Sequence, residues 1–192
     1  MVILVDMDDV LEQLVEAMVR YNNIHYGTNV KSGDVVEWNL TKAFPMLTRE
    51  QVYSPEYDED FWATVDPMPD ADRVLRRLME EGHEVYVVTA SFYETLKQKM
   101  DDLLFRWYPF LDWNHVIVTT NKQMIQGDVL IDDGPHNLTG GDYRKILFDR
   151  PHNRDFDEKS VGAIRVYDWE EIYEQICLMA ELQEEKKPNE QR

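Results

Sequence analysis

The chain has little of what marks secreted, membrane-spanning or nucleic-acid-binding proteins. Its 192 residues include a single cysteine, Cys177, so no disulfide can form within the chain and a reducing compartment is the simple interpretation. It contains 20 lysines and arginines against 38 aspartates and glutamates, and this net charge of −18 argues against non-specific nucleic-acid binding. No apolar run approaches the ~20 residues of a membrane span. These absences together favour a cytoplasmic protein.

What the chain does contain is enough apolar material for a core, in a regular alternation of strand and helix patterns. Hydrophobic residues make up 43% of the sequence and aromatic residues 11%, too many for a disordered chain. Strands are predicted at 2–5, 84–88, 115–119, 128–131, 145–148 and 163–166, and helices at about 10–26, 70–81, 92–107 and 168–184. The alternation predicts an α/β fold, with a parallel sheet and helices on both of its faces.

The first predicted strand ends in a cluster of carboxylates. Residues 2–5 form a continuous apolar run, typical of a strand buried on both faces, and Asp6, Asp8 and Asp9 follow it. Asp6 and Asp8 are two residues apart, so in an extended chain their side chains point the same way. Like charges this close cost free energy unless a cation or a proton offsets them. The cluster indicates a metal site, although a solvated acidic turn would also explain it.

A second cluster repeats this pattern. Another short apolar strand is followed by Asp132, Asp133 and a glycine turn. Because ligands bind at the carboxyl ends of strands in open α/β sheets, the two clusters together predict a hard oxygen site suited to Mg²⁺. A strand between them in the sequence ends in Thr89, with Ser91 close behind. Those hydroxyls can hold phosphate oxygens or cap the next helix, and the two roles can coexist.

These motifs resemble those of a known superfamily. Asp6-Met7-Asp8-Asp9-Val10-Leu11, Thr89 after a strand, and Ile131-Asp132-Asp133 are similar to the first, second and fourth motifs of the haloacid dehalogenase superfamily of phosphohydrolases. More narrowly, the chain from about residue 2 to about residue 176 resembles the 5′(3′)-deoxyribonucleotidase family, including its bacterial and phage members. The stretches behind the narrower resemblance are Asp60-Phe61-Trp62, Asp66-Pro67-Met68-Pro69, Asn121-Lys122, Asp132-Asp133-Gly134-Pro135-His136-Asn137-Leu138 and Leu147-Phe148-Asp149-Arg150-Pro151-His152-Asn153.

The resemblance implies a catalytic role for each motif. Asp6 is the nucleophile that forms an aspartyl-phosphate, and Asp8 is the general acid and then the general base. Asp132 joins Asp6 and the backbone carbonyl of Asp8 as a magnesium ligand, and Asp133 binds the metal or orients a metal-bound water. Thr89 donates a hydrogen bond to the phosphate.

The lysine that the family uses to stabilise phosphoryl charge does not map cleanly. Lys97, Lys99 and Lys122 are the candidates. The expected position falls near Met100, one residue from Lys99, and one residue on a helix turns a side chain by about 100°, so a small insertion would be required. Lys122 fits the spacing of another family lysine, ten positions before Asp132. Lys99 is favoured and Lys122 comes second. The alternative for Lys97 and Lys99 is a solvent-exposed helix face without a role in the site, which is where most lysines lie.

Other positions concern substrate contact or depart from the family pattern. Phe61 and Trp62 are predicted to contact a nucleobase, because the resemblance places an aromatic residue there. Ala90 and Ser91 are predicted at the phosphate, with Ala90 replacing a small hydroxyl residue of animal members. Asp9 stands where many relatives carry glycine, and its side chain is expected either to alter the metal surroundings or to point to solvent.

The segment 15–68 interrupts the alternation of strands and helices. It has few strand signals but is rich in aromatic residues, and in this superfamily a small helical cap is inserted after the first strand. The resemblance therefore implies a Rossmann-like parallel sheet core, the haloacid dehalogenase fold, formed by residues 1–14 and 69–184, with a cap at 15–68. The charged residues 185–192 are predicted to be a frayed tail. The aromatic residues of the cap are Tyr21, Tyr26, Trp38, Phe44, Tyr53, Tyr57, Phe61 and Trp62.

The resulting prediction is a magnesium-dependent phosphomonoesterase for nucleoside monophosphates, preferably deoxyribonucleotides. Its partner is a small phosphomonoester rather than a nucleic-acid polymer or a membrane, and a homodimer stays open. Alternatives are a phosphatase for another small phosphomonoester, a catalytically inactive nucleotide-binding relative, and a signalling receiver domain. A receiver needs a lone phospho-accepting aspartate after a middle strand, whereas the middle strands here end at Thr89 and Thr119.

Overall fold

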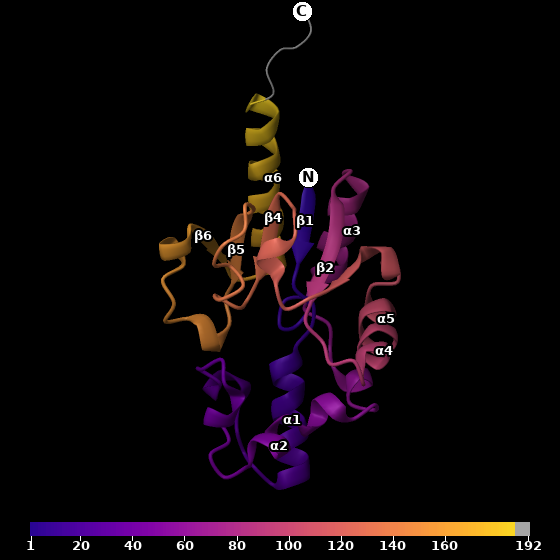
Figure 1. The fold of residues 1–192 in the computed structure, drawn as a ribbon, viewed down its shortest axis with the longest axis vertical. Helices are drawn as coiled ribbons and strands as arrows, with labels where there is room; N and C mark the ends of the chain where they lie inside the picture. Colours follow the sequence, from indigo (N-terminus) through magenta and orange to yellow (C-terminus); the bar gives the residue numbers. More distant parts are fainter. Residues whose placement is uncertain (187–192) are drawn as a thin grey trace, which may run out of the picture.

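The centre of the molecule is a fully parallel sheet of six strands. The computed structural model describes residues 1–186 (Figure 1), and the strand order is β3-β2-β1-β4-β5-β6. The strands are β1 (Val2–Val5), β2 (Glu84–Thr89), β3 (Val116–Val118), β4 (Val129–Asp132), β5 (Arg144–Phe148) and β6 (Ala163–Val166). All six predicted strands and the α/β class are therefore confirmed.

β1 lies in the middle of the sheet and aligns the strands on either side. Its Val5 pairs with Val87 of β2 and with Ile131 of β4. The Asp6 amide donates to the Ile131 carbonyl over 2.9 Å, which extends the pairing by one residue. The residues that follow β1, β2 and β4 therefore leave the sheet side by side, at its carboxyl edge.

The main core lies between one face of the sheet and the helices. α3 (Ala71–Glu80) buries the i, i+3, i+4 and i+7 positions Ala71, Val74, Leu75 and Leu78 against it. α6 (Trp169–Lys186) packs beside α3 on the same core. A third helical stretch consists of α4 (Leu96–Gln98), η5 (Lys99–Leu104) and α5 (Phe105–Trp107). The predicted helices at 70–81 and 168–184 are confirmed, whereas the one predicted from residue 92 begins at Leu96.

The opposite face of the sheet is covered by loops, so the prediction of helices on both faces is wrong. Leu4, Val88, Leu130 and Leu147 form a second apolar cluster there, to which no α-helix within residues 1–186 contributes a buried residue. The connections from β3 to β6 are too short and too rich in turn residues to form regular helices. In the described residues between α5 and α6, the only helices are the 3-10 helices η6 (Trp113–His115), η7 (Lys122–Met124), η8 (Pro151–Asn153) and η9 (Glu158–Val161).

A helical segment between β1 and β2 lies beyond the carboxyl ends of the strands (Figure 1). The first helix was predicted to begin near residue 10 but begins at Leu14, because Asp9 adopts a left-handed conformation with φ of 56° and turns the chain first. The elements of this segment are α1 (Leu14–Tyr26), η1 (Ser32–Asp34), η2 (Leu40–Lys42), α2 (Arg49–Val52), η3 (Ser54–Tyr57) and η4 (Trp62–Thr64).

The helical segment enters and leaves the core at one place. The Gln13 amide donates to the Asp66 carbonyl over 3.0 Å, and the Met68 amide donates to the Leu11 carbonyl over 2.7 Å. The two connecting stretches therefore run side by side. The predicted division at residues 15 and 68 falls close to this crossing, and it stays a prediction.

At the other end of the chain, α6 continues through Glu185 and Lys186, where the predicted tail would begin. The remainder of that tail, 187–192, lies outside the described residues. Within residues 1–186, no helix is both long and apolar enough to cross a membrane.

The loop-covered face offers a direct test of the packing. A Cβ atom added at Gly127 would lie 2.7 Å from Cγ of Leu4, a buried residue of that face. Gly127→Ala should therefore lower the free energy of unfolding by about 1–3 kcal/mol through overpacking. Gly33→Ala is the matched control, because a Cβ at Gly33 meets no atom within 4 Å. Urea unfolding of both variants measures the difference, and equal stabilities would contradict the packing described.

Candidate active site

Three buried carboxylates meet at the carboxyl edge of the sheet. Asp6 follows β1, Asp132 ends β4 and Asp133 comes next, so the pairing of β1 with β4 brings them together. One carboxylate oxygen from each lies within 4.8 Å of the others. All three side chains are almost completely shielded from solvent, with at most 5% of any residue exposed. The two acidic clusters thus form one site, as the strand pattern predicted.

Lys122 is the cation that holds this cluster together. Its Nζ lies 2.7 Å from Oδ1 of Asp6 and 2.6 Å from Oδ2 of Asp132. It begins η7, in the connection between β3 and β4, and is itself buried. Burial alone would lower the pKa of Lys122, but the charges of Asp6 and Asp132 outweigh it and raise the pKa above its usual value. Lys122 is therefore a permanent positive charge between two of the three carboxylates.

Backbone and amide groups fix the remaining oxygens of Asp6 and Asp132. The Met7 amide donates to Oδ1 of Asp6 over 2.7 Å. The Gly134 amide and the Asn137 side chain donate to Oδ1 of Asp132 over 2.8 and 3.0 Å. These bonds hold both carboxylates in one orientation before any ligand arrives.

Asp133 is the least satisfied member of the cluster. Nε2 of His152 lies 2.9 Å from its Oδ2, whereas its Oδ1 is buried with no hydrogen-bond partner. Burial, followed by the charge of Asp132, raises the pKa of Asp133 well above its usual value, and the same two causes raise that of Asp6. An orphaned oxygen among crowded carboxylates is what a bound divalent cation would relieve, so these residues fit the predicted magnesium ion.

A second buried lysine holds Asp8. Nζ of Lys99 lies 2.6 Å from Oδ1 of Asp8, and it also donates to Oγ1 of Thr89 over 3.2 Å and to the Ala90 carbonyl over 3.1 Å. Lys99 is 1% exposed, so it is far from the solvated helix face of the alternative interpretation. Lys97 does occupy such a face, where it pairs with Asp101.

A π-helical turn explains how Lys99 reaches the site. The helix η5, from Lys99 to Leu104, is a π-helix, which places one more residue in its turn than an α-helix does. The one-residue offset between Lys99 and the expected family position near Met100 required such an insertion. The extra residue keeps the following helix in register with the core, where Met100, Leu103 and Leu104 are buried.

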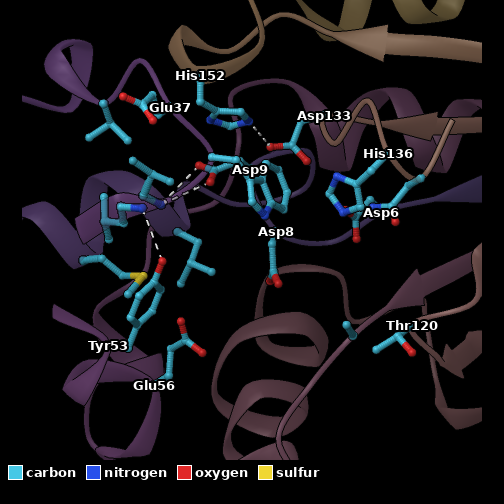
Figure 2. A pocket seen from close by; sticks show the side chains of 18 of the residues that line it. Asp6, Asp8, Asp9, Glu37, Tyr53, Glu56, Thr120, Asp133, His136 and His152 are labelled. Carbon is cyan, nitrogen blue, oxygen red and sulfur yellow. Dashed lines mark hydrogen bonds and ion pairs between the residues drawn. The ribbon is translucent and has the colours of Figure 1, made fainter. Parts of the chain in front are cut away.

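A cavity of about 440 Å³ opens between the sheet edge and the helical segment. Figure 2 shows Asp6, Asp8 and Asp133 on one side of it, with Tyr53 and Glu56 reaching in from the helical segment. A smaller cavity of about 300 Å³ adjoins it. Residues common to both walls are Asp8, Leu14, Glu56, Ala90 and Thr120.

The predicted substrate contacts are distributed unevenly around these cavities. Ala90 lines both cavities, and Ser91 and Trp62 line the smaller one. Phe61 lines neither, because it is 1% exposed and packs edge-on against Trp62 in the core. Thr89 is also fully buried, behind Ala90, and reaches Lys99 instead of the open cavity.

Several residues of the larger cavity were not assigned to the site from the sequence. Trp38 and Tyr53 belonged to the aromatic set of the cap, but nothing in the sequence distinguished them from the buried members. His152 was visible only as a residue of a family-like stretch, whereas His136, which follows the aspartate pair, was expected near the mouth of the site. The further lining residues that received no role are Leu14, Val15, Met18, Val35, Glu37, Leu40, Glu56, Thr119, Thr120 and Asn137.

Asp9 does not point to solvent, contrary to one of its two predicted outcomes. It is buried, and its carboxylate accepts the backbone N–H of Val15 at the start of α1 over 3.2 Å. Burial, followed by the charge of Asp133, raises the pKa of Asp9 to about 7. Asp9 thus anchors the helical segment to the site.

The fold of this chain is shared with solved hydrolase structures. The same fold is found in a haloacid dehalogenase family hydrolase from Deinococcus radiodurans R1, solved with bound phosphate and sodium. The TM-score is 0.66 at 14% sequence identity, and the match covers 93% of this chain and 96% of that one. An identity this low is evidence for the fold alone. The chain therefore has the fold of the haloacid dehalogenase type, with aspartates at the carboxyl ends of β1 and β4.

The particular family follows from the sequence relatives. Residues 1–183 match the family model of the 5′ nucleotidase, deoxy (pyrimidine), cytosolic type C protein (NT5C). A 5′(3′)-deoxyribonucleotidase from Bacillus subtilis (strain 168) is 37% identical over 173 residues, covering 89% of this chain and 95% of the relative. One from Clostridium acetobutylicum is 28% identical over 168 residues, covering 87% and 89%. The chain belongs to this nucleotidase family, as the motifs predicted, and is a phosphoric monoester hydrolase.

The raised pKa values of the cavity carboxylates predict how stability depends on pH. The pKa values of Asp9 and Glu56 are both raised to about 7, so the folded chain binds these protons more tightly than the unfolded chain does. Without divalent metal, the free energy of unfolding should therefore fall as the pH rises from about 5 to about 7.5. Urea unfolding in the presence of EDTA measures this slope.

Asp9→Asn isolates the contribution of one group, because asparagine keeps the acceptor oxygen and tolerates the left-handed backbone. This variant should show a shallower fall in stability with pH than the unmodified protein. Glu50→Gln, at an exposed position, is the control and should leave the slope unchanged. A slope as steep in Asp9→Asn as in the unmodified protein would contradict the assignment.

Proposed function

We propose that the protein hydrolyses nucleoside monophosphates, preferably deoxyribonucleotides, through an aspartyl-phosphate on Asp6 with the help of Mg²⁺. The observation that carries the proposal is the position of Asp6, which is fixed by Lys122 and the Met7 amide at the floor of a cavity with aromatic side chains in its wall. The names of the relatives from Bacillus subtilis and Clostridium acetobutylicum support the choice of substrate.

Asp6 is the proposed nucleophile. Its carboxylate oxygen attacks phosphorus, and the bond from phosphorus to the ester oxygen of the sugar breaks, which leaves the phosphoryl group on Asp6. Lys122 is close enough to offset negative charge on Asp6 and on the incoming phosphoryl group. Because the Lys122 side chain is already held by Asp132, it needs no rearrangement to do so.

Asp8 is the proposed acid and base. It stands two residues from Asp6, lines both cavities, and can give a proton to the departing sugar oxygen and later take one from the attacking water. That water cleaves the bond between phosphorus and Asp6 and releases inorganic phosphate. Lys99 keeps the Asp8 carboxylate directed into the cavity, and Thr89 is proposed to orient Lys99 from behind.

The metal would be held by Asp6, Asp132 and Asp133, with the backbone carbonyl of Asp8 as a further ligand proposed from the family pattern. A divalent cation bound there supplies positive charge that offsets the repulsion between carboxylates and phosphate. The unpartnered Oδ1 of Asp133 and the proximity of the three carboxylates are the observations that support this ligand set.

The nucleobase is proposed to bind beside Trp38, and the helical segment 15–68 to act as the cap that carries this residue. Trp38 lies edge-on to His136 and to His152, with ring centroids 4.6 and 5.1 Å away, and its own ring is partly exposed at the cavity wall. An exposed aromatic face is suited to stacking on a base, which is worth about 1–3 kcal/mol. In this proposal Trp38 makes the base contact that was predicted for Phe61 and Trp62.

The proposed mechanism is tested by two near-isosteric substitutions. Asp6→Asn should lower kcat by at least about 10³-fold because the nucleophile is lost, and Asp8→Asn by about 10²–10⁴-fold because proton transfer is lost. Phosphate release is measured from deoxyribonucleoside and ribonucleoside monophosphates and from sugar phosphates, with Mg²⁺ and with EDTA. Asp102→Asn, at an exposed position, is the control. Activity close to that of the unmodified protein in either site variant, or full activity in EDTA, would refute the mechanism.

The proposed base site is tested by comparing two tryptophans of similar exposure. Trp38→Ala should raise KM for nucleotides roughly 10-fold through lost stacking, and should leave hydrolysis of p-nitrophenyl phosphate, which has no base, nearly unchanged. Trp113 is 53% exposed against 55% for Trp38 but lines neither cavity, so Trp113→Ala is the matched control. If Trp38→Ala lowered both activities equally, the residue would serve the structure instead of the base.

A further inference from the structure

Glu56 is held in a fixed place between the helical segment and the sheet. It belongs to η3, where the neighbouring Tyr57 stacks on Phe92 with ring centroids 5.0 Å apart. The buried Thr95 hydroxyl donates to the backbone carbonyl of Glu56 over 2.8 Å. These two contacts fasten the η3 turn to the loop after β2, and they fix the backbone from which the Glu56 side chain extends.

The side chain of Glu56 stands where the two cavities meet. It lines both of them, as do Asp8, Ala90 and Thr120. Figure 2 shows Glu56 and Asp8 reaching into the same space, Asp8 from the end of β1 and Glu56 from the helical segment. In a substrate whose phosphate lies at Asp6 and whose ester oxygen lies at Asp8, the atoms beyond the ester oxygen enter the space that Glu56 lines.

The Glu56 carboxylate has no partner of its own. Within residues 1–186, no hydrogen bond or ion pair reaches its side-chain oxygens, although it is half-buried. Burial, and then the charge of Asp8, raises its pKa to about 7, while Lys99 acts in the opposite sense. Lys99 is already engaged by Asp8, Thr89 and Ala90. An unpaired, half-buried carboxylate is free to accept a hydrogen bond from a ligand that enters the cavities.

We propose that Glu56 is a specificity-determining residue, which accepts a hydrogen bond from a sugar hydroxyl of the substrate and excludes substrates that carry a second phosphate. The inference rests on the proposed function and extends it to the choice between nucleoside monophosphates and bisphosphates. The 3′-hydroxyl of a 5′-monophosphate, four bonds beyond the ester oxygen, is the group proposed to donate to Glu56. A phosphate at that place presents only oxygen acceptors and a like charge, which the carboxylate repels.

Two substitutions separate the charge of Glu56 from its acceptor oxygen. Glu56→Gln keeps an acceptor and removes the charge, and Glu56→Ala removes both. Glu50→Gln is the matched control, because Glu50 lies in the same helical segment and is exposed. The substrates are a 2′-deoxynucleoside 5′-monophosphate, its 2′,3′-dideoxy analogue, the corresponding 3′,5′-bisphosphate, and p-nitrophenyl phosphate. The full-length protein with Mg²⁺ is used, and kcat/KM is measured for each.

The proposal predicts a distinct pattern across these substrates. Glu56→Gln should raise kcat/KM for the bisphosphate by at least about 10-fold, since a like charge is removed. Glu56→Ala should lower kcat/KM for the deoxynucleotide by on the order of 10-fold, since a hydrogen bond to a charged acceptor is lost. The same variant should leave the dideoxy analogue and p-nitrophenyl phosphate within about twofold, because neither offers the hydroxyl.

Two results would overturn the proposal. An unchanged ratio of bisphosphate to monophosphate in Glu56→Gln would refute the charge filter, and a parallel loss on p-nitrophenyl phosphate in Glu56→Ala would assign Glu56 a structural role. If the unmodified protein cleaves p-nitrophenyl phosphate but no nucleotide, the proposed function fails and this inference fails with it. If it cleaves the deoxynucleotide and the variants do not change the ratios, the inference alone fails.

Discussion

The site depends on one buried ion pair system, in which the ammonium of Lys122 lies between the carboxylates of Asp6 and Asp132. In a chain with a net charge of −18, bringing three aspartates together out of water is strongly unfavourable unless positive charge lies among them. Lys122 supplies part of that charge without any ligand. Lys122 comes from the connection between β3 and β4, so it also joins that loop to the central strands. The same residue therefore shapes the bottom of the cavity and supplies positive charge to the site.

The sheet and its acidic edge were predictable because local sequence determines them. β1 and β4 are buried on both faces, so they appear as continuous apolar runs, and each run ends abruptly in aspartates. Strand pairing does the rest, since it brings Asp6 beside Asp132 and Asp133 without any contribution from distant loops. The spacing of Lys122 relative to Asp132 was also visible, because Lys122 lies in the connection that leads directly into β4 and Asp132 is the last residue of that strand.

Other features could not be predicted, because packing between distant parts of the chain decides them. The 3-10 helices of the helical segment are only three or four residues long, too short to leave a periodic pattern. Aromatic residues are common there, and only the packed structure distinguishes the buried Phe61 from Trp38 at the cavity wall. Lys99 illustrates the same limit, since a π-helical turn has no signature in residue types and appears only as a mismatch in counting.

The side-by-side entry and exit of the helical segment has a consequence for how such proteins diversify. Backbone hydrogen bonds join Leu11 to Met68 and Gln13 to Asp66. The chain between these residues is therefore a closed loop whose two ends are fixed on the core. The entropic cost of closing a loop grows only slowly with its length. Evolution can therefore lengthen, shorten or exchange everything between these stretches with little penalty to the sheet, and the range of substrates can change while the chemical machinery is inherited intact.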